Sequence, residues 1–186
     1  MNSPRRLSSV LSTEDERLSC FDVEVFHLNQ RQSLNPLYNE IKESILAKGV
    51  QEPLHAVFHP DLNQWVLSQG GQTRLLICRE LYESSKDEMF LYPPIIRKKF
   101  TSDLDLVVSH LVENHLRGEN SFLETSNAVI NIRRLMGQSD GGEPTQEALA
   151  DEMESRGLPI RRQSITSMVY LSEHLAPKVT NKGFLT

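Results

Sequence analysis

The hydrophobic pattern changes near Asp103, and this change constrains the fold more than any other feature of the sequence. Before it, four short runs have the alternating or continuous apolar pattern of strands, and segments of helical spacing lie among them. The runs are FDVEVFHL, PLHAVFHP, QWVLSQ and PPIIRKKF. From Asp103 onward every periodic segment has helical spacing. We therefore expect an α+β fold, with a small mixed-sheet domain followed by an all-α domain.

The chain divides into three expected parts. Residues 1–19 are rich in serine and charge and lack a long apolar stretch, which predicts a flexible tail and not a secretory signal. The mixed-sheet domain is expected over residues 20–100, and the helical domain over residues 101–186. No segment approaches the roughly 18–20 consecutive apolar residues of a membrane span. The two cysteines, Cys20 and Cys78, are too few for a disulfide framework, so a cytoplasmic protein with reduced thiols is the simplest interpretation.

Two helices are expected in the first part. In NPLYNEIKESILAKG, the apolar residues Leu37, Ile41 and Ile45 recur every four positions, and Gly49 follows them as a helix C-cap. A second helix begins at about Gln72, directly after the strand run QWVLSQ and a pair of glycines. The DLN segment between the two preceding strand runs has turn chemistry, so these runs are expected to form a hairpin.

Four helix patterns follow in the second part. The first, SDLDLVVSHLVENHLRG, ends at its last glycine. Ser121 and Glu124 form an S-x-x-E capping box, which starts the second helix at the next residue after the serine. This helix is expected to end near Met136, with Gly137 beyond it, and GQSDGGEP then reads as a linker.

The last two helix patterns predict a helix-turn-helix over residues 145–172. Thr145 caps QEALADEMESRG, and a short LPI turn leads into RRQSITSMVYLSEHL. Polar side chains at the start of the second helix are candidates to reach phosphates and base edges of double-stranded DNA. They are Arg161, Arg162, Gln163, Ser164 and Ser167. Two amphipathic helices in an ordinary bundle give the same pattern, and a net charge of −5 argues against a uniformly basic surface but not against a local patch.

The segment SQGGQTRLL joins a strand to a helix through Gly70 and Gly71. Glycines let the backbone turn sharply and approach a ligand closely, and the N-terminus of the next helix offers free N–H groups to an anion. Arg74, one turn into the helix, adds a positive charge. The pattern therefore indicates an anion site, although an ordinary glycine-rich turn looks the same.

The segment ENHLRG places Glu113, Asn114 and Arg117 on one helix face, because they are three and four residues apart. A surface ion pair between the glutamate and the arginine is one interpretation, contributing about 0.3–0.5 kcal/mol. The other is a polyanion site, in which the carboxylate and amide hold a hydrated divalent cation and the guanidinium meets phosphate oxygens. The spacing alone leaves both open.

The order of these pieces resembles the ParB family of DNA-partition proteins over residues 21–186. The segment ESILAKGVQEPLHA resembles the family's SI-x-x-x-G-x-x-x-PL stretch, and ENHLRGENSFLETSNAV resembles its E-N-x-x-R stretch and the helix that follows. The segment NQR, which ends at Arg31, resembles the N-P-x-x-R type of loop, and Gly71 and Arg74 match the first and last positions of the G-E-R-R motif. The variant GGQTR is most similar to the ParB-type proteins of integrative conjugative elements.

This resemblance implies a ParB/sulfiredoxin-like domain that binds CTP with Mg²⁺, and a helix-turn-helix that binds a specific site in double-stranded DNA during partition or maintenance of a plasmid or mobile element. It also implies a ParA-type ATPase partner, a homodimer and a place on the bacterial nucleoid. By the same resemblance, Glu113 and Asn114 would hold the metal, and Arg5 and Arg6 would stimulate the partner ATPase. The residues implied for the nucleotide are Arg31, Gly70, Gly71, Gln72, Thr73, Arg74, Asn114 and Arg117.

The motif departs from the family at Gln72 and Thr73, which stand where a glutamate and an arginine are usual. Losing one charge-assisted phosphate contact costs about 1.5–3 kcal/mol, roughly ten- to a hundredfold in affinity. We therefore expect a weakened nucleotide site, with at most weak hydrolysis of CTP and no other enzymatic activity. Two alternatives stay open: a nuclease or nucleotide-hydrolysing enzyme on the same scaffold, and a DNA-binding regulator with a vestigial nucleotide pocket.

Overall fold

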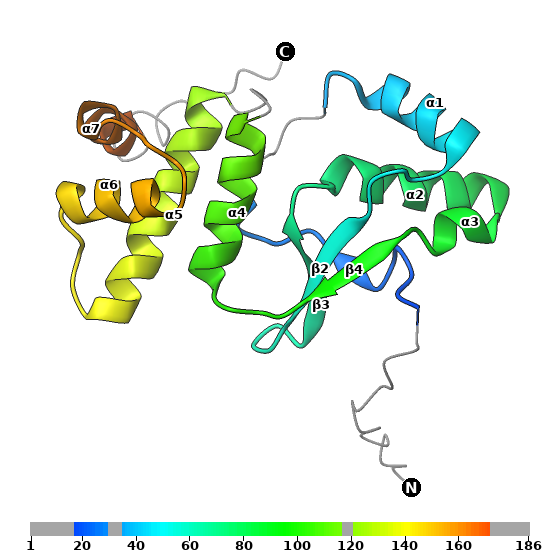
Figure 1. Ribbon diagram of the computed structural model, residues 1–186, viewed down its shortest axis with the longest axis horizontal. Helices are drawn as coiled ribbons and strands as arrows, with labels where there is room; N and C mark the ends of the chain where they lie inside the picture. Colours follow the sequence, from blue (N-terminus) through cyan, green and yellow to red (C-terminus); the bar gives the residue numbers. More distant parts are fainter. Residues whose placement is uncertain (1–16, 30–34, 117–120, 172–186) are drawn as a thin grey trace, which may run out of the picture.

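The described part of the chain is a mixed sheet covered by helices, followed by a group of packed helices (Figure 1). The computed structural model describes residues 17–29, 35–116 and 121–171. The sheet lies toward one end of the molecule and the later helices lie toward the other (Figure 1). The α+β class expected from the sequence is confirmed.

Four strands form one sheet: β1 (Val23–Glu24), β2 (Leu54–His59), β3 (Gln64–Gln69) and β4 (Ile95–Lys98). Their order in the sheet is β1–β3–β2–β4. β2 and β3 form the predicted antiparallel hairpin, whereas β1 runs parallel to β3 and β4 runs parallel to β2. Asn63 takes a positive φ of 50° in the hairpin turn, a conformation that asparagine tolerates better than most residues.

Seven helices accompany the sheet in the described residues. They are α1 (Tyr38–Lys48), α2 (Gln72–Ser85), α3 (Glu88–Leu91), α4 (Asp103–Leu116), α5 (Phe122–Asp140), α6 (Gln146–Ser155) and α7 (Arg162–Tyr170). α2 covers one face of the sheet, and α1 and α3 pack around α2 (Figure 1). Within the described ranges, every helix is too short or too polar to cross a membrane.

The alternation of side chains along β3 explains why both faces of the sheet are covered. Leu67 points to one side and packs with Leu75 of α2. Val66 points to the other side and packs with Leu111 of α4. Because consecutive strand residues face opposite ways, a strand that is apolar at adjacent positions must be buried on both faces.

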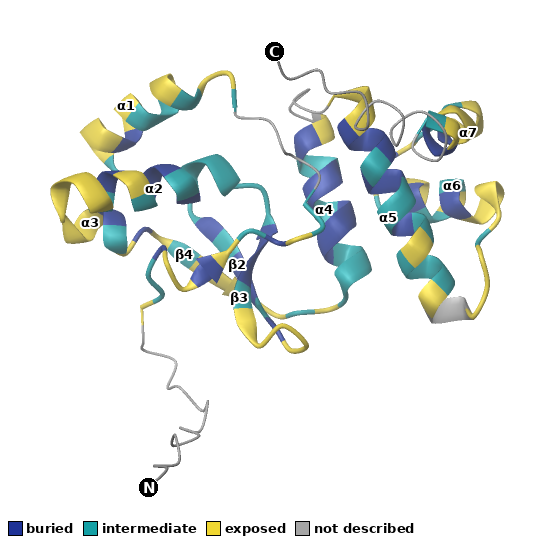
Figure 2. Cartoon of the chain, turned by 180° about the vertical axis from the view of Figure 1, so that it is seen from behind, coloured by how far each residue is buried: buried dark blue, intermediate teal, exposed yellow. Residues whose placement is uncertain are grey.

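The hydrophobic core on the α4 side continues into the helical part. It joins Val66 of the sheet to Leu111 of α4, Ile132 of α5, Met153 of α6 and Ile165 of α7. Figure 2 shows the buried sides of α4 and α5 meeting here, while α1 and α3 at the opposite end are largely exposed. The helical part is therefore packed directly on the sheet through α4.

Several helix ends lie where the sequence predicts them. The amide of Gly49 donates to the carbonyl of Ile45 at 2.8 Å and closes α1. Ser121 and Glu124 form both hydrogen bonds of the capping box at the start of α5, and the side chain of Thr145 caps α6. These local signals suffice because each one satisfies backbone groups that a helix end leaves without an intrahelical partner.

The strand predicted for FDVEVFHL is much shorter in the structure, where only Val23 and Glu24 pair with β3. The chain turns at the end of this run, where the amide of Asn29 donates to the carbonyl of Phe26 at 2.8 Å. The guanidinium of Arg79 binds two backbone carbonyls near the start of the run. It donates from Nε to Cys20 at 2.9 Å and from Nη2 to Val23 at 2.7 Å. A side chain from α2 thus ties the start of this segment to the helix.

The predicted end of α5 is wrong, because the helix continues through Gly137 to Asp140. Gly141, with a φ of 73°, takes the left-handed position that ends the helix. A Cβ at Gly137 would lie 3.2 Å from the carbonyl oxygen of Gly142, so the glycine inside the helix lets the following turn approach closely. The helix α3 was not predicted, although Asp87 caps it by accepting from the amide of Met89 at 2.9 Å.

Candidate functional site

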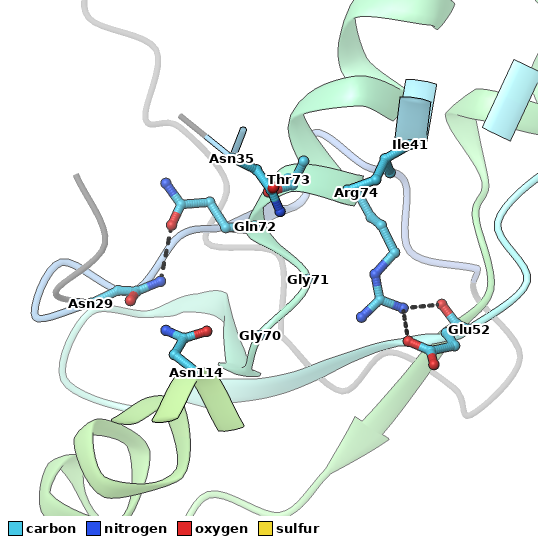
Figure 3. A pocket seen from close by; sticks show the side chains of 10 residues that line it. All are labelled: Asn29, Asn35, Ile41, Glu52, Gly70, Gly71, Gln72, Thr73, Arg74 and Asn114. Atoms are coloured by element: carbon cyan, nitrogen blue, oxygen red, sulfur yellow. Dashed lines mark hydrogen bonds and ion pairs between the residues drawn. The ribbon is translucent and has the colours of Figure 1, made fainter. Parts of the chain in front are cut away.

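A cavity of about 220 Å³ lies where β3 ends and α2 begins (Figure 3). It is lined by Asn29, Asn35, Ile41, Glu52, Gly70, Gly71, Gln72, Thr73, Arg74 and Asn114. Six of these residues were singled out from the sequence. The structure brings the glycine turn of one motif together with Asn114 of the other, from segments that are some forty residues apart in the chain.

Both glycines of the turn are required by the backbone. Gly70 and Gly71 have φ values of 31° and 77°. A Cβ at Gly70 would lie 2.2 Å from an oxygen of the Glu113 carboxylate, and one at Gly71 would lie 2.7 Å from Leu54 Cδ2. The absence of side chains here lets α4 approach the turn and leaves the backbone open to the cavity.

The N-terminus of α2 faces this cavity without a side-chain cap. Gly71 is the N-cap residue and has no side chain to accept a hydrogen bond. The first bond of the helix runs from the amide of Leu75 to the carbonyl of Gly71 at 2.9 Å. The amides of Gln72, Thr73 and Arg74 precede it and have no partner within the helix. Such a group of N–H donors, at the positive end of the helix dipole, is suited to bind an anion.

Two polar pairs stand on opposite sides of the cavity (Figure 3). On one side, Nδ2 of Asn29 donates to Oε1 of Gln72 at 3.1 Å. On the other side, Nη1 of Arg74 donates to the carbonyl oxygen of Glu52 at 2.5 Å and lies 3.3 Å from its Oε2. The side-chain amide of Asn114, from α4, lies near Gly70 on the side of the Asn29–Gln72 pair (Figure 3).

Asn114 is held in place by the packing of α4 on β3. One helical turn earlier, His110 is buried and donates from Nε2 to the carbonyl oxygen of Leu67 at 3.0 Å. Burial lowers the pKa of His110 to about 4, so the ring is neutral at neutral pH. The hydrogen bond of the neutral histidine helps to position α4 along and around its own axis beside the glycine turn.

Glu113 and Asn114 lie on different sides of Gly70. Asn114 lines the cavity described above, whereas Glu113 packs against Gly70 and lines a neighbouring cavity with Gln69 and Arg156. A carboxylate and an amide oxygen are ligands that Mg²⁺ accepts, and this ion takes its remaining ligands from water and phosphate. Each of the two side chains has the ligand chemistry for that partial role, from its own side of Gly70. In the described ranges, no three His, Cys, Asp or Glu side chains group closely enough to form a complete metal site.

Four of the predicted site residues lie outside the described ranges. They are Arg5, Arg6, Arg31 and Arg117. Four residues of the lining were not predicted for this site: Asn29, Asn35, Ile41 and Glu52. Asn29 begins the NQR segment that resembles the N-P-x-x-R loop, so that resemblance is a signal that could have found it. Glu52 lies in a loop without a motif.

The candidate DNA-contacting residues lie at the start of α7 and are mostly exposed. Arg161, Arg162, Gln163 and Ser167 are exposed and Ser164 is half-buried. The apolar side of the helix is buried against α5 and α6, as a sequence with this spacing predicts.

Two residues of the exposed side of α7 were not predicted. Thr166 and Tyr170 are four residues apart on this side, and Tyr170 is 57% exposed. Arg162 forms an ion pair with Glu147 of α6 at 2.8 Å, and both side chains are more than half exposed. Such an exposed ion pair contributes little to stability, so the guanidinium can leave Glu147 and bind another group.

No known protein-family model matches the chain, and no curated protein matches it. Two crystal structures of the C-terminally truncated chromosome-partitioning protein ParB from Caulobacter crescentus are similar in part. The one complexed to the centromeric parS site has 15% identity and a TM-score of 0.45, and covers 89% of this chain and 75% of its own. The one complexed with CTP-γ-S has 17% identity and a TM-score of 0.44, and the match covers 89% of this chain and 82% of that chain.

A Pnob8-like ParB-N domain, solved in its C222₁ form, has a TM-score of 0.59 and 16% identity. The match covers 89% of this chain and 71% of that one. The chain therefore has the ParB-N fold. The resemblance to ParB that the sequence motifs indicate is confirmed at the level of the fold.

Proposed function

We propose that this chain is a ParB-like DNA-binding partition protein with a nucleotide site at the N-terminus of α2. One observation carries the proposal: on a ParB-N fold, the uncapped start of α2 and the Gly70–Gly71 turn open onto a cavity that Asn114 closes from α4. A row of backbone amides without intrahelical partners, beside a buried amide side chain, suits a phosphorylated ligand that also carries a polar base or sugar.

The ligand we propose is CTP with Mg²⁺, in keeping with the sequence resemblance. The amides that begin α2 would bind the phosphates, and Arg74 would add a charged contact. Glu113 and Asn114 would hold the cation beside Gly70. When bound, the cation neutralises part of the phosphate charge, which the single arginine of the described lining cannot do alone. Arg31 and Arg117 are proposed as further phosphate contacts.

The DNA-binding element we propose is α6 with α7, acting as a helix-turn-helix. The exposed side of α7 carries Arg161, Arg162 and Gln163 at its N-terminal end, which is the end that reaches base edges in such motifs. The acidic residues Glu147, Asp151 and Glu154 of α6 are exposed. Docking is therefore expected through α7, with α6 tilted away from the phosphates.

The wider role follows the same proposal. We infer a homodimer acting with a ParA-type ATPase, whose stimulation would need Arg5 and Arg6, in the partition or maintenance of a plasmid or mobile element on the nucleoid. DNA binding gives the first test. Selection from random duplex DNA should enrich one motif, and variants with Gln163→Ala should lose the preference for it. If no motif were enriched and all duplexes bound with equal affinity, specific DNA binding would be refuted.

A further inference from the structure

Arg74 is already engaged by a carboxylate inside the cavity. Its guanidinium donates to the backbone carbonyl of Glu52 and lies 3.3 Å from the Glu52 carboxylate (Figure 3). These two are the charged residues among the described lining, so the lining has no net formal charge. A polyanion entering this cavity meets a cation that is partly neutralised.

The two partners differ in how firmly they are held. The side chain of Arg74 is 16% exposed, whereas that of Glu52 is 72% exposed. The backbone at Glu52 is anchored on its C-terminal side, because the amide of Leu54 donates to the carbonyl of Pro94 at 2.8 Å where β2 begins. The Glu52 carboxylate can therefore swing into solvent while its backbone carbonyl keeps Arg74 oriented toward the cavity.

We infer that Glu52 is a specificity-determining residue, whose carboxylate occupies on Arg74 the place of a ligand phosphate and must be displaced for the ligand to bind. The inference rests on the proposed nucleotide function of this cavity. Carboxylates and phosphates bind a guanidinium in the same way, so the two compete. An exposed ion pair is weak, and a chain of phosphates that also reaches the α2 amides can displace it.

The competition selects ligands by charge. A ligand without phosphates leaves the Arg74–Glu52 pair intact, whereas a polyphosphate gains the Arg74 contact only after expelling the carboxylate. The substitution Glu52→Gln removes the charge and keeps an oxygen that can accept from Arg74. We expect it to tighten binding of a triphosphate about three- to tenfold and to leave binding of an uncharged nucleoside unchanged.

The test is calorimetric titration of the full chain with CTP, inorganic tripolyphosphate and cytidine, each with and without Mg²⁺. Glu43→Gln, on the exposed side of α1, is the matched control because it removes the same charge outside the cavity. The expected result is tighter binding of CTP and tripolyphosphate by Glu52→Gln alone. In an Arg74→Ala background the same substitution should change affinity less than about twofold, because the guanidinium for which Glu52 and the phosphate compete is gone.

Three results would overturn the inference. Equal CTP affinity in the wild type and Glu52→Gln would show that the carboxylate does not compete, while leaving the nucleotide function intact. Weaker binding by Glu52→Gln only with Mg²⁺ would make Glu52 a ligand of the cation. Binding of neither CTP nor tripolyphosphate by either protein would remove the proposed nucleotide function together with the inference.

Discussion

His110 on α4 donates a hydrogen bond to the carbonyl oxygen of Leu67 on β3, at 3.0 Å. Leu67 lies three residues before Gly70, and His110 lies one helical turn before Asn114. This bond therefore connects β3, which leads into the glycine turn, to α4, which carries Asn114 to the cavity wall. The other ring nitrogen, Nδ1, is buried and has no hydrogen-bond partner in the described part of the chain.

The neutral state of His110 makes stability depend on pH. Burial lowers its pKa from 6.5 to about 4, so the unfolded chain takes up this proton at a higher pH than the folded chain does. The stabilising contribution is complete above pH 6.5 and is lost as the pH falls toward 4. The protonation of this residue alone lowers the free energy of unfolding by about 3 kcal/mol over this pH range.

Chemical denaturation from pH 7 to 4 checks this prediction by comparing the wild type with His110→Gln. We expect the variant to be less stable at pH 7 and the difference between the two proteins to shrink as the pH falls. His115→Gln, on the exposed side of the same helix, should follow the wild type throughout. If the difference in unfolding free energy between the wild type and His110→Gln stayed constant from pH 7 to 4, a buried neutral histidine would be contradicted.

Gly70→Ala is expected to destabilise the fold by roughly 1–3 kcal/mol, because it adds a Cβ in a left-handed backbone conformation against the Glu113 carboxylate. Gly142→Ala is the matched control, since a Cβ there meets no atom within 4 Å. Urea unfolding of both variants gives the comparison. Adding Glu113→Ala should restore part of the loss at Gly70, and a purely additive double variant would show that the clash is not the cause.

Asn114→Ala should weaken CTP binding about tenfold with little change in fold, because it removes one neutral hydrogen-bonding group from the cavity wall. Asn39→Ala, on the exposed side of α1, removes the same amide away from the cavity and should leave affinity unchanged. Titration with CTP and Mg²⁺ measures both. Equal affinities in the two variants would place the nucleotide elsewhere.

Arg161→Ala should weaken binding to all duplex sequences alike and lower the slope of log affinity against log salt by about 1, as expected for a phosphate contact. Gln163→Ala should instead act on the preferred site, with a loss of about 1–3 kcal/mol there. Fluorescence anisotropy over a range of salt concentrations separates these effects. A salt slope unchanged in Arg161→Ala would remove that residue from the interface.

Local signals in the sequence predicted much of this fold, and the errors have identifiable causes. The capping box at Ser121, the hairpin and the glycine turn before Gln72 each depend on neighbours in the chain, and each is present. The extent of β1 depends on which of its residues pair with β3, from a distant part of the chain, and the end of α5 depends on the turn that packs against Gly137. Contacts between distant segments leave no periodic trace in a sequence.

In the candidate site, too, local motifs were predicted and contacts between distant segments were not. The glycine turn and Asn114 were identified from their motifs, and the structure brings them to one cavity. The pairing of Arg74 with Glu52 and of Gln72 with Asn29 was not foreseen, because each partner comes from a loop far along the chain from the residue that it binds. These two pairs set the charge and the polarity of the cavity, so they govern which ligand it accepts.

The most direct test of the nucleotide site is the response of the backbone amides at the start of α2. In ¹⁵N-resolved NMR spectra, addition of CTP with Mg²⁺ should shift the amide resonances of Gly71, Gln72 and Thr73 in a saturable way. Cytidine should leave them in place, because it carries no phosphate. Saturable shifts confined to other parts of the chain, or no shifts at millimolar CTP, would contradict a phosphate site at the N-terminus of α2.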